Sequence, residues 1–352
     1  MDIYSSKLYL DDIQKAADCF LPWEKLQSKN ILISGATGLI GSFLVDVLMT
    51  KNQAGMNCTV YAMCRNGKQA QERFGKWRGS SRLVILSHDI VLPLSGNDVG
   101  TVDYVLHLAS NTHPLQYATD PIGTITTNVI GLRNMLDYAA EHHTLRFAFA
   151  SSNEVYGENR GDTEFFGEEY CGYLDSNTLR AGYPESKRCG EALCQAYIAQ
   201  KGLDVVIPRL TRSYGPTMRM NDSKAISQFI RKAVDGEDIV LKSAGNQYYS
   251  YTYAADAVTG LLSVLLSGKK GEAYNIADPA SDTTLKELAA LIAGISGTNV
   301  IFEKPDDVEA AGYSKATKAR LDGEKVRRLG WSAKYNLNDG LARTITVLRE
   351  MK

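Results

Sequence analysis

Tyr183 and Lys187 stand four residues apart in the stretch YPESK, and on a helix this spacing places both side chains on one face. A free tyrosine, with a pKa of about 10, is a poor base at neutral pH. A neighbouring ammonium group favours the phenolate. We therefore expect Tyr183 to take a proton from a hydroxyl group while hydride leaves the same carbon. The alternative is a purely structural pair, because this spacing alone is common.

The stretch FAFASSNEVYG brings a second set of polar residues to the end of an apolar run. Ser152 is expected to hydrogen-bond the same hydroxyl group and the carbonyl oxygen that develops from it. Glu154 follows two residues later, and a carboxylate at the end of a buried strand costs stability unless it is paired or used. We interpret Glu154 as a catalytic acid or base; the alternative is a buried carboxylate that caps backbone amides.

The glycine-rich turn GATGLIG lies between an apolar strand and an apolar helix. Its glycines suit a tight turn, close approach of the backbone to a pyrophosphate, and close packing of helix on strand. The helix that follows offers free N–H groups to phosphates. We predict a dinucleotide site here, rather than an ordinary glycine-rich loop, formed by Gly35, Thr37, Gly38, Leu39, Ile40, Gly41, Ile90, Leu108, Ala109, Ser110, Tyr183 and Lys187.

The residues after the second strand leave the cofactor open between NAD and NADP. An NAD site usually has Asp or Glu about 20 residues beyond the glycines. This chain has Arg65 there, which could accept the 2′-phosphate of NADP or be a solvated surface residue. Asp89, at the end of the third strand, could accept from the adenine amino group or simply belong to a turn. We assign NAD as the cofactor, with NADP possible, and both residues to its site. Together with the Lys187 ammonium, the positive nicotinamide ring of the oxidised cofactor is expected to favour the Tyr183 phenolate.

The elements that must position these residues alternate between apolar strands and helices from Asn30 onward. This rhythm predicts an α/β fold, a Rossmann-type doubly wound parallel sheet with a smaller C-terminal α/β substrate domain. We expect single strands at 145–152 and 203–215, and helices at 128–142 and 185–202. The predicted organisation is an N-terminal extension (1–29), a dinucleotide-binding domain (30–215) and a mainly substrate-binding domain (216–352), some of which returns to the first sheet.

The composition of the chain argues against several classes of function. The formal net charge of −1 argues against a nucleic-acid binder, and the start lacks the pattern of a signal peptide. No apolar run reaches the roughly 20 residues of a membrane span. The six cysteines have no CxxC pairing and no close histidine, so we expect no metal site. We predict a cytoplasmic protein without nucleic-acid or membrane partners.

Taken in order, the glycine turn, HLAS, SSNEVYG and YPESK resemble the extended short-chain dehydrogenase/reductase family. Within it, the stretches YPESKRCGEALCQAY, SYGPTMRMNDSKAISQFI and RLDGEKVRRLGW are most similar to UDP-glucuronate decarboxylase-like enzymes of the NAD-dependent epimerase/dehydratase family. The resemblance implies a nucleoside-diphosphate sugar that is oxidised at carbon 4, changed, and reduced again. It implies catalytic roles for Tyr183, Lys187, Ser152 and Glu154, and substrate contacts from Asn111, Asn153, Arg180, Arg212, Asn221, Tyr249 and Arg320.

Three departures from the family pattern affect the expected reaction. Tyr249 stands where the family carries an Arg that contacts substrate, and Asn153 replaces the Asp that is the acid in 4,6-dehydratases. Arg212 replaces a sugar-contacting Asn and could restore positive charge, or be a salt-bridged structural residue. An amide is no general acid and a phenol is no guanidinium. We therefore favour epimerisation after oxidation at carbon 4, with decarboxylation, 4,6-dehydration or net NADP-dependent reduction as alternatives.

The helices 128–142 and 183–197 offer apolar residues on more than one face. One face must pack on the sheet, and the other could contact a second subunit. Members of the family that the chain resembles commonly form dimers in this way. The alternative is that the N-terminal extension covers it. We expect a homodimer.

Overall fold

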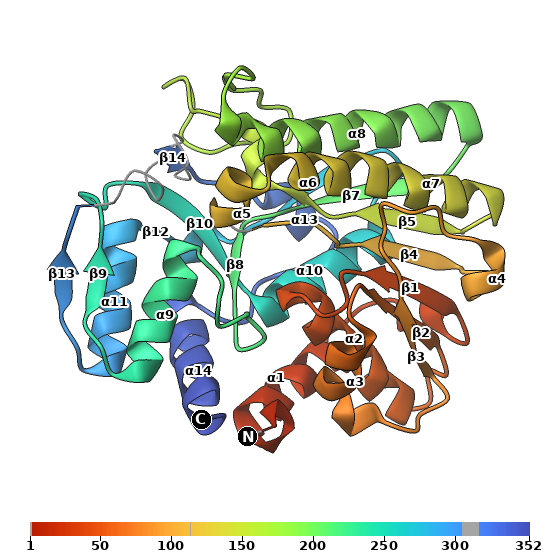
Figure 1. Cartoon of the computed structure of the whole chain (residues 1–352), viewed down its shortest axis with the longest axis horizontal. Helices are drawn as coiled ribbons and strands as arrows, with labels where there is room; N and C mark the ends of the chain where they lie inside the picture. Colours follow the sequence, from red (N-terminus) through yellow and green to blue (C-terminus); the bar gives the residue numbers. More distant parts are fainter. Residues whose placement is uncertain (1, 113, 305–316) are drawn as a thin grey trace.

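The computed structural model describes residues 2–112, 114–304 and 317–352. Its centre is an eight-stranded sheet (Figure 1). Seven strands follow the order β11-β7-β5-β4-β1-β2-β3, the eighth, β6, pairs with β7, and every pairing is parallel. The predicted Rossmann-type α/β fold is confirmed. The strands of this sheet are β1 (Asn30–Ser34), β2 (Thr59–Cys64), β3 (Leu83–Ser87), β4 (Tyr104–His107), β5 (Arg146–Phe149), β6 (Ser151–Ser152), β7 (Val205–Leu210) and β11 (Ala273–Ile276).

Helices cover both faces of this sheet, which explains why its strands read as nearly continuous apolar runs. In Figure 1 one layer lies above the sheet and the other below. The layer above contains α5 (Pro114–Thr119), α6 (Pro121–Thr126), α7 (Leu132–Glu141) and α8 (Gly182–Lys201). The layer below contains α2 (Leu39–Gln53), α3 (Gly67–Arg73) and α10 (Ala254–Ser267), and the short α4 (Gly96–Val99) lies at the edge.

Two of the expected single strands are broken, and both breaks lie beside the site described below. The run 145–152 divides into β5 and β6 at Ala150, whose carbonyl oxygen accepts from the Lys187 ammonium at 2.9 Å. The run 203–215 divides at Thr211 into β7 and β8 (Arg212–Tyr214), and β8 pairs with β10 of another sheet. Both breaks fall where the apolar run gives way to polar residues, at Ser151 and at Thr211.

The smaller C-terminal part contains a four-stranded sheet and a two-stranded sheet. Segments after Gly215 also return to the large sheet, since β11 is its edge strand and α10 packs against β5 and β7. The elements of this part are β9 (Ile239–Leu241), β10 (Tyr248–Tyr253), β12 (Asp282–Thr284), β13 (Val300–Phe302), β14 (Lys318–Ala319), α9 (Ala225–Asp235), α11 (Leu285–Ser296), α13 (Glu324–Arg327) and α14 (Leu337–Glu350).

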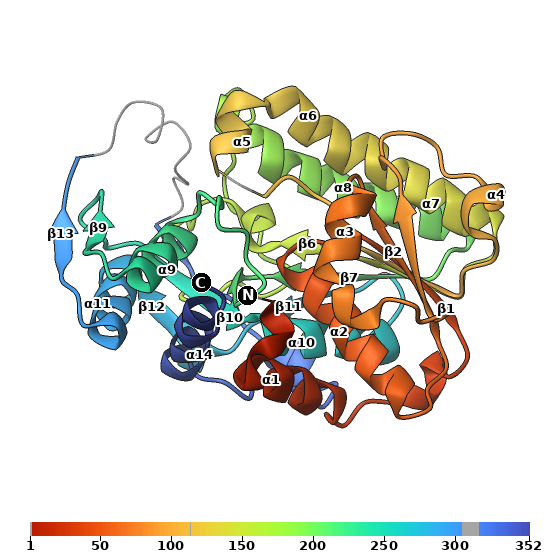
Figure 2. The ribbon, with the colours of Figure 1, turned by 60° about the horizontal axis from the view of Figure 1, so that its bottom comes forward.

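The N-terminal extension forms α1 (Lys7–Ala17) and a 3₁₀ turn, Trp23–Leu26. Helix α1 packs between α2, α10 and α14, so the two chain termini lie close together (Figure 2). Two buried carboxylates fix it there. Asp12 accepts hydrogen bonds from Tyr253 and Tyr335, and Asp46 accepts from Tyr9 at 2.5 Å. The extension thus joins both parts of the molecule and lies away from α7 and α8.

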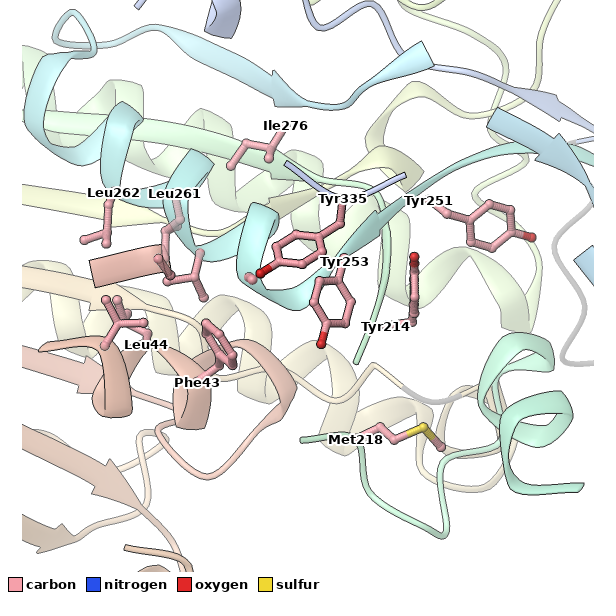
Figure 3. Close-up of a cluster of buried hydrophobic side chains, with 14 of the residues drawn as sticks. Phe43, Leu44, Tyr214, Met218, Tyr251, Tyr253, Leu261, Leu262, Ile276 and Tyr335 are labelled. Carbon is pink, nitrogen blue, oxygen red and sulfur yellow. The ribbon is translucent and has the colours of Figure 1, made fainter. Parts of the chain in front are cut away.

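The main apolar core lies between the large sheet and the helices below it. Phe43 and Leu44 of α2 face Leu261 and Leu262 of α10, and all four side chains are fully buried (Figure 3). The core continues into a group of buried tyrosines toward the C-terminal part, Tyr214, Tyr251, Tyr253 and Tyr335. This continuous packing holds β10 against the large sheet, and β10 supplies one wall of the candidate site.

Candidate active site

A cavity of about 690 Å³ runs from the glycine turn, past the ends of the central strands, to β10. Its volume is within the usual range of ligand-binding clefts. Nearly every residue predicted for the site lines it, although these residues are scattered over more than 200 positions of sequence. The lining includes Gly35, Thr37, Gly38, Leu39, Ile40, Gly41, Arg65, Asp89, Ile90, Leu108, Ala109, Ser110, Asn111, Ser152, Asn153, Glu154, Arg180, Tyr183, Lys187, Arg212, Asn221 and Tyr249.

Arg320 is the exception among the predicted residues. It does not line the cavity; its guanidinium pairs with Glu164 at 2.8 Å and lies over the rings of Phe165 and Tyr248. The sequence pattern placed it near substrate, but an aromatic and acidic environment holds it elsewhere in this structure.

The glycine turn fits a dinucleotide pyrophosphate. Gly35 has φ +72°, and a Cβ there would approach the Ala109 backbone nitrogen to 2.8 Å. A Cβ at Gly41 would meet the Gly35 oxygen at 2.3 Å, so helix and turn pack too closely for any side chain. Gly38 is the N-cap of α2 and provides no side-chain cap, which leaves the first N–H groups of the helix available to a phosphate.

At the adenosine end of the cavity, Arg65 is exposed at the end of β2 and Asp89 follows β3. The Asp89 side chain accepts from the Val91 N–H at 3.2 Å, as a turn residue does. Both side chains line the cavity, so each remains available to a cofactor. No carboxylate follows β2 directly, as the sequence indicated.

Tyr183 and Lys187 lie on α8, as their spacing predicted, and both are buried. Burial raises the pKa of Tyr183 to about 12, and the charge of Glu154 adds to the rise; hydrogen bonds with Ser152 and Ser110 act in the opposite direction. These surroundings contain no cofactor, and the phenolate was expected only with the positive ring of the cofactor beside Tyr183. The Lys187 ammonium instead donates to Ala150.

The environment of Lys187 lowers the pKa of its ammonium group. Burial lowers its pKa to about 8, and the nearby charge of Glu191 partly opposes that change. Its ammonium also lies 4.7 Å from the centre of the Phe149 ring. At neutral pH Lys187 is therefore a buried cation close to the end of β6, where Ser152 lies.

Glu154 is paired in this structure with Arg180, another residue predicted for the site. One guanidinium nitrogen donates to both carboxylate oxygens, at 2.7 and 2.6 Å. Their side chains are only 19% and 14% exposed, which makes this a largely buried pair. The partner of the Glu154 carboxylate is thus a guanidinium rather than the backbone amides of the alternative reading, and the carboxylate lines the cavity beside Tyr183.

Arg212 and Tyr249 contact each other across neighbouring strands. Tyr251 of β10 is the register partner of Arg212 on β8, and the Arg212 guanidinium lies 3.4 Å from the centre of the Tyr249 ring. Burial raises the pKa of Tyr249, while the adjacent Arg212 lowers it. In the described part of the chain no carboxylate lies within salt-bridge distance of Arg212.

Two further site residues carry no sequence signal that we recognised. Tyr117 of α5 stacks on Tyr183, with ring centres 4.8 Å apart. The Arg180 guanidinium also lies over the Tyr117 ring, 4.8 Å from its centre.

Asn128 lies in a π-helical turn, Thr127–Gly131, at the start of the predicted helix 128–142. Its side chain connects Ser110 to Ser186 through hydrogen bonds of 2.7 and 2.8 Å. Such turns are frequent at functional sites.

Curated proteins with similar sequences identify relatives of this chain. The chain is 33% identical to UDP-glucuronic acid decarboxylase 1 of Xenopus tropicalis over 92% of its length and 72% of that protein. It is 33% identical to UDP-glucuronic acid decarboxylase 3 of Arabidopsis thaliana, over 88% of this chain and 86% of that one.

Solved structures share the fold. A dTDP-glucose 4,6-dehydratase from Streptomyces venezuelae, with NAD bound, has a TM-score of 0.79 at 26% identity, covering 91% of this chain and 97% of its own. A UDP-glucuronic acid 4-epimerase from Bacillus cereus has the same TM-score at 22% identity, covering 92% and 100%. In the described residues no helix is long and apolar enough to cross a membrane. Residues 31–277 match the NAD dependent epimerase/dehydratase family, and the chain therefore belongs to this family of NAD-dependent enzymes.

Proposed function

We propose that this protein oxidises a nucleotide sugar at carbon 4, alters the sugar next to the new carbonyl, and then restores the carbon 4 hydroxyl. The observation that carries the proposal is that Tyr183, Ser152 and Lys187 open onto the same cavity as the glycine turn. When bound, NAD supplies the hydride acceptor and donor together with a positive charge in its oxidised form.

In this proposal Tyr183 takes the proton of the carbon 4 hydroxyl. Ser152 holds that hydroxyl by a hydrogen bond, and positive charge from Lys187 stabilises the phenolate. The stacked ring of Tyr117 keeps the Tyr183 ring in place and excludes water from one side. Oxidation makes the neighbouring carbon 5 acidic, because a carbanion there is conjugated with the carbonyl.

Two middle steps are candidates. In epimerisation, Glu154 removes the carbon 5 proton and a proton returns on the other face. In decarboxylation, the carbon 5–carbon 6 bond of a sugar acid breaks, its electrons form the enolate, carbon dioxide leaves, and carbon 5 is protonated. Sequence similarity to the decarboxylases supports the second step, and the position of Glu154 beside Tyr183 supports the first.

Product analysis tests the proposal. The protein, loaded with NAD, is incubated with a panel of UDP-, CDP- and dTDP-sugars, and products are identified by NMR while released carbon dioxide is measured. We expect a product with no net change in NADH. Stoichiometric use of added NADPH would instead identify the net reductase, and a chain that turns over none of these sugars would contradict the proposal.

We also propose that the protein is a homodimer formed through α6, α7 and α8. Ile122, Ile125 and Ile130 are exposed on this layer, and Ile122 is 79% exposed. The N-terminal extension packs on the opposite side of the sheet and so does not cover them. Light scattering should give twice the chain mass, and Ile122→Asp should give the monomer. A monomeric wild-type protein would refute the dimer.

A further inference from the structure

The N-terminal extension packs against the part of the molecule that carries the glycine turn. Helix α1 contacts α2, the helix that begins at this turn, and lies beside it in both views (Figures 1 and 2). The region matched by the family begins at residue 31, so α1 precedes it. What α1 does therefore has to follow from its own contacts.

Asp46 of α2 is the centre of a buried network that the extension completes. Its carboxylate accepts from the Tyr4 hydroxyl at 2.6 Å and from the Tyr9 hydroxyl at 2.5 Å, and it pairs with Arg73 at 2.7 Å. Trp77 donates a further hydrogen bond at 2.6 Å. Asp46 is fully buried, and a buried carboxylate is stable only with such partners. The extension thus supplies two of the donors on which this carboxylate depends.

The same two tyrosines also hold Arg73. Its guanidinium donates to the Tyr4 hydroxyl and to the Tyr9 hydroxyl, each at 2.7 Å. Burial raises the pKa of both tyrosines, and the charge of Asp46 adds to the rise, so both hydroxyls are protonated at neutral pH. Replacing them by Phe removes bonds to Asp46 and Arg73 and changes no charge.

Arg73 is the last residue of α3, and the start of α3 forms part of the cavity wall. The N-cap residue Asn66 accepts from the Gln69 N–H at 3.0 Å, and both residues line the cavity where β2 ends. The helix has only seven residues, about two turns, which is too short to be stable without tertiary contacts. The position of its first turn therefore depends on how its last residue is held.

We propose that the extension positions the adenosine wall of the cofactor site: Tyr4 and Tyr9, through Asp46 and Arg73, hold α3 so that its first turn faces the bound dinucleotide. Neither tyrosine lines the cavity, so both are positioning residues. When α3 is loosened, fewer molecules have a complete site, and the apparent affinity falls by that fraction. The inference concerns NAD binding and holds whichever sugar the protein processes.

The test measures binding by calorimetry to the full-length protein after its cofactor has been removed. The ligands are NAD and ADP-ribose, which has the same adenosine diphosphate and no nicotinamide. We expect Tyr4→Phe combined with Tyr9→Phe to weaken both ligands about 10-fold, because the affected wall lies at the adenosine end. Tyr4→Phe alone should weaken both about threefold, and it carries the test if the double variant does not fold.

Asp12→Asn is the matched control. Asp12 is a buried residue of the same helix, but its partners Tyr253 and Tyr335 belong to the C-terminal part. This variant should lower the free energy of unfolding and leave the affinity for ADP-ribose within about twofold. Unchanged ADP-ribose affinity in the tyrosine variants, or an equal loss of affinity in Asp12→Asn, would overturn the inference, because the extension would then only stabilise the fold.

Discussion

Arg209 and Arg212 lie three residues apart, yet their surroundings are opposite. All the nitrogens of Arg209 have acceptors: Glu191 takes two hydrogen bonds at 2.9 and 2.6 Å, and Nη1 donates to the Tyr156 hydroxyl at 2.8 Å. Arg212 faces the cavity with a ring beneath it and a donor unused. The difference teaches that two buried arginines so close in sequence can differ in kind: Arg209, with all its nitrogens bonded, is part of the architecture, whereas Arg212, with a donor left over, lines the cavity.

The largest expected effect comes from removing the satisfied arginine. Arg209→Leu leaves the Glu191 carboxylate buried without its partner, so we expect the free energy of unfolding to fall by about 3–5 kcal/mol. Arg212→Leu removes no ion pair with any residue that the structure describes, and should change the free energy of unfolding by less than about 1 kcal/mol. Urea unfolding at pH 7 measures both. Equal losses of stability in the two variants would contradict the contrast between Arg209 and Arg212.

Tyr156 and Tyr183 show the same contrast between a side chain that is bonded inside the fold and one that faces the cavity. The Tyr156 hydroxyl donates to Asn275 at 2.5 Å behind the site, whereas Tyr183 opens onto the cavity. We expect Tyr183→Phe to lower turnover by about 1,000-fold with little change in NAD affinity, because it removes the proton acceptor. Tyr156→Phe should lower stability by about 1–3 kcal/mol and keep most of the turnover. Turnover that persists in Tyr183→Phe would contradict the assigned role.

Lys187 extends the contrast to a buried cation whose charge depends on pH. Its pKa is lowered to about 8, against about 10.4 in an unfolded chain, so between these values the unfolded chain binds more protons and stability rises with pH. Lys187→Met should therefore be more stable than wild type at pH 7, by about 3 kcal/mol, and lose that advantage toward pH 10.5. A difference that stays constant with pH would show that burial does not control this charge.

The smallest effect is expected at Arg65, the exposed arginine of the cofactor end. Arg65→Ala should weaken NADP about 10-fold and leave NAD within about twofold, because only NADP has a phosphate for this side chain. Fluorescence titration with each cofactor measures this. Unchanged affinity for both would identify Arg65 as a solvated surface residue.

What could be predicted from the sequence was local. The spacing of Tyr183 and Lys187 and the glycine turn depend on one helix and one strand-to-helix connection, and the structure places both as expected. The pair between Glu154 and Arg180, and the stacking of Tyr117, depend on segments that meet only after folding. The change of strand partner at Thr211 has the same origin, since β8 pairs with β10 of another sheet. Arg320 shows the reverse case, a residue matched by pattern but held away by its neighbours.

The central claim is that carbon 4 gives up a hydride and receives it back, and labelling carbon 4 tests it most directly. UDP-glucuronate and UDP-glucose carrying deuterium at carbon 4 are turned over by the NAD-loaded protein, and the product is examined by NMR and mass spectrometry. We predict that deuterium is retained at carbon 4 of the product. Deuterium found on added cofactor, or a product formed with the carbon 4 bond never broken and no transient NADH absorbance, would contradict this account.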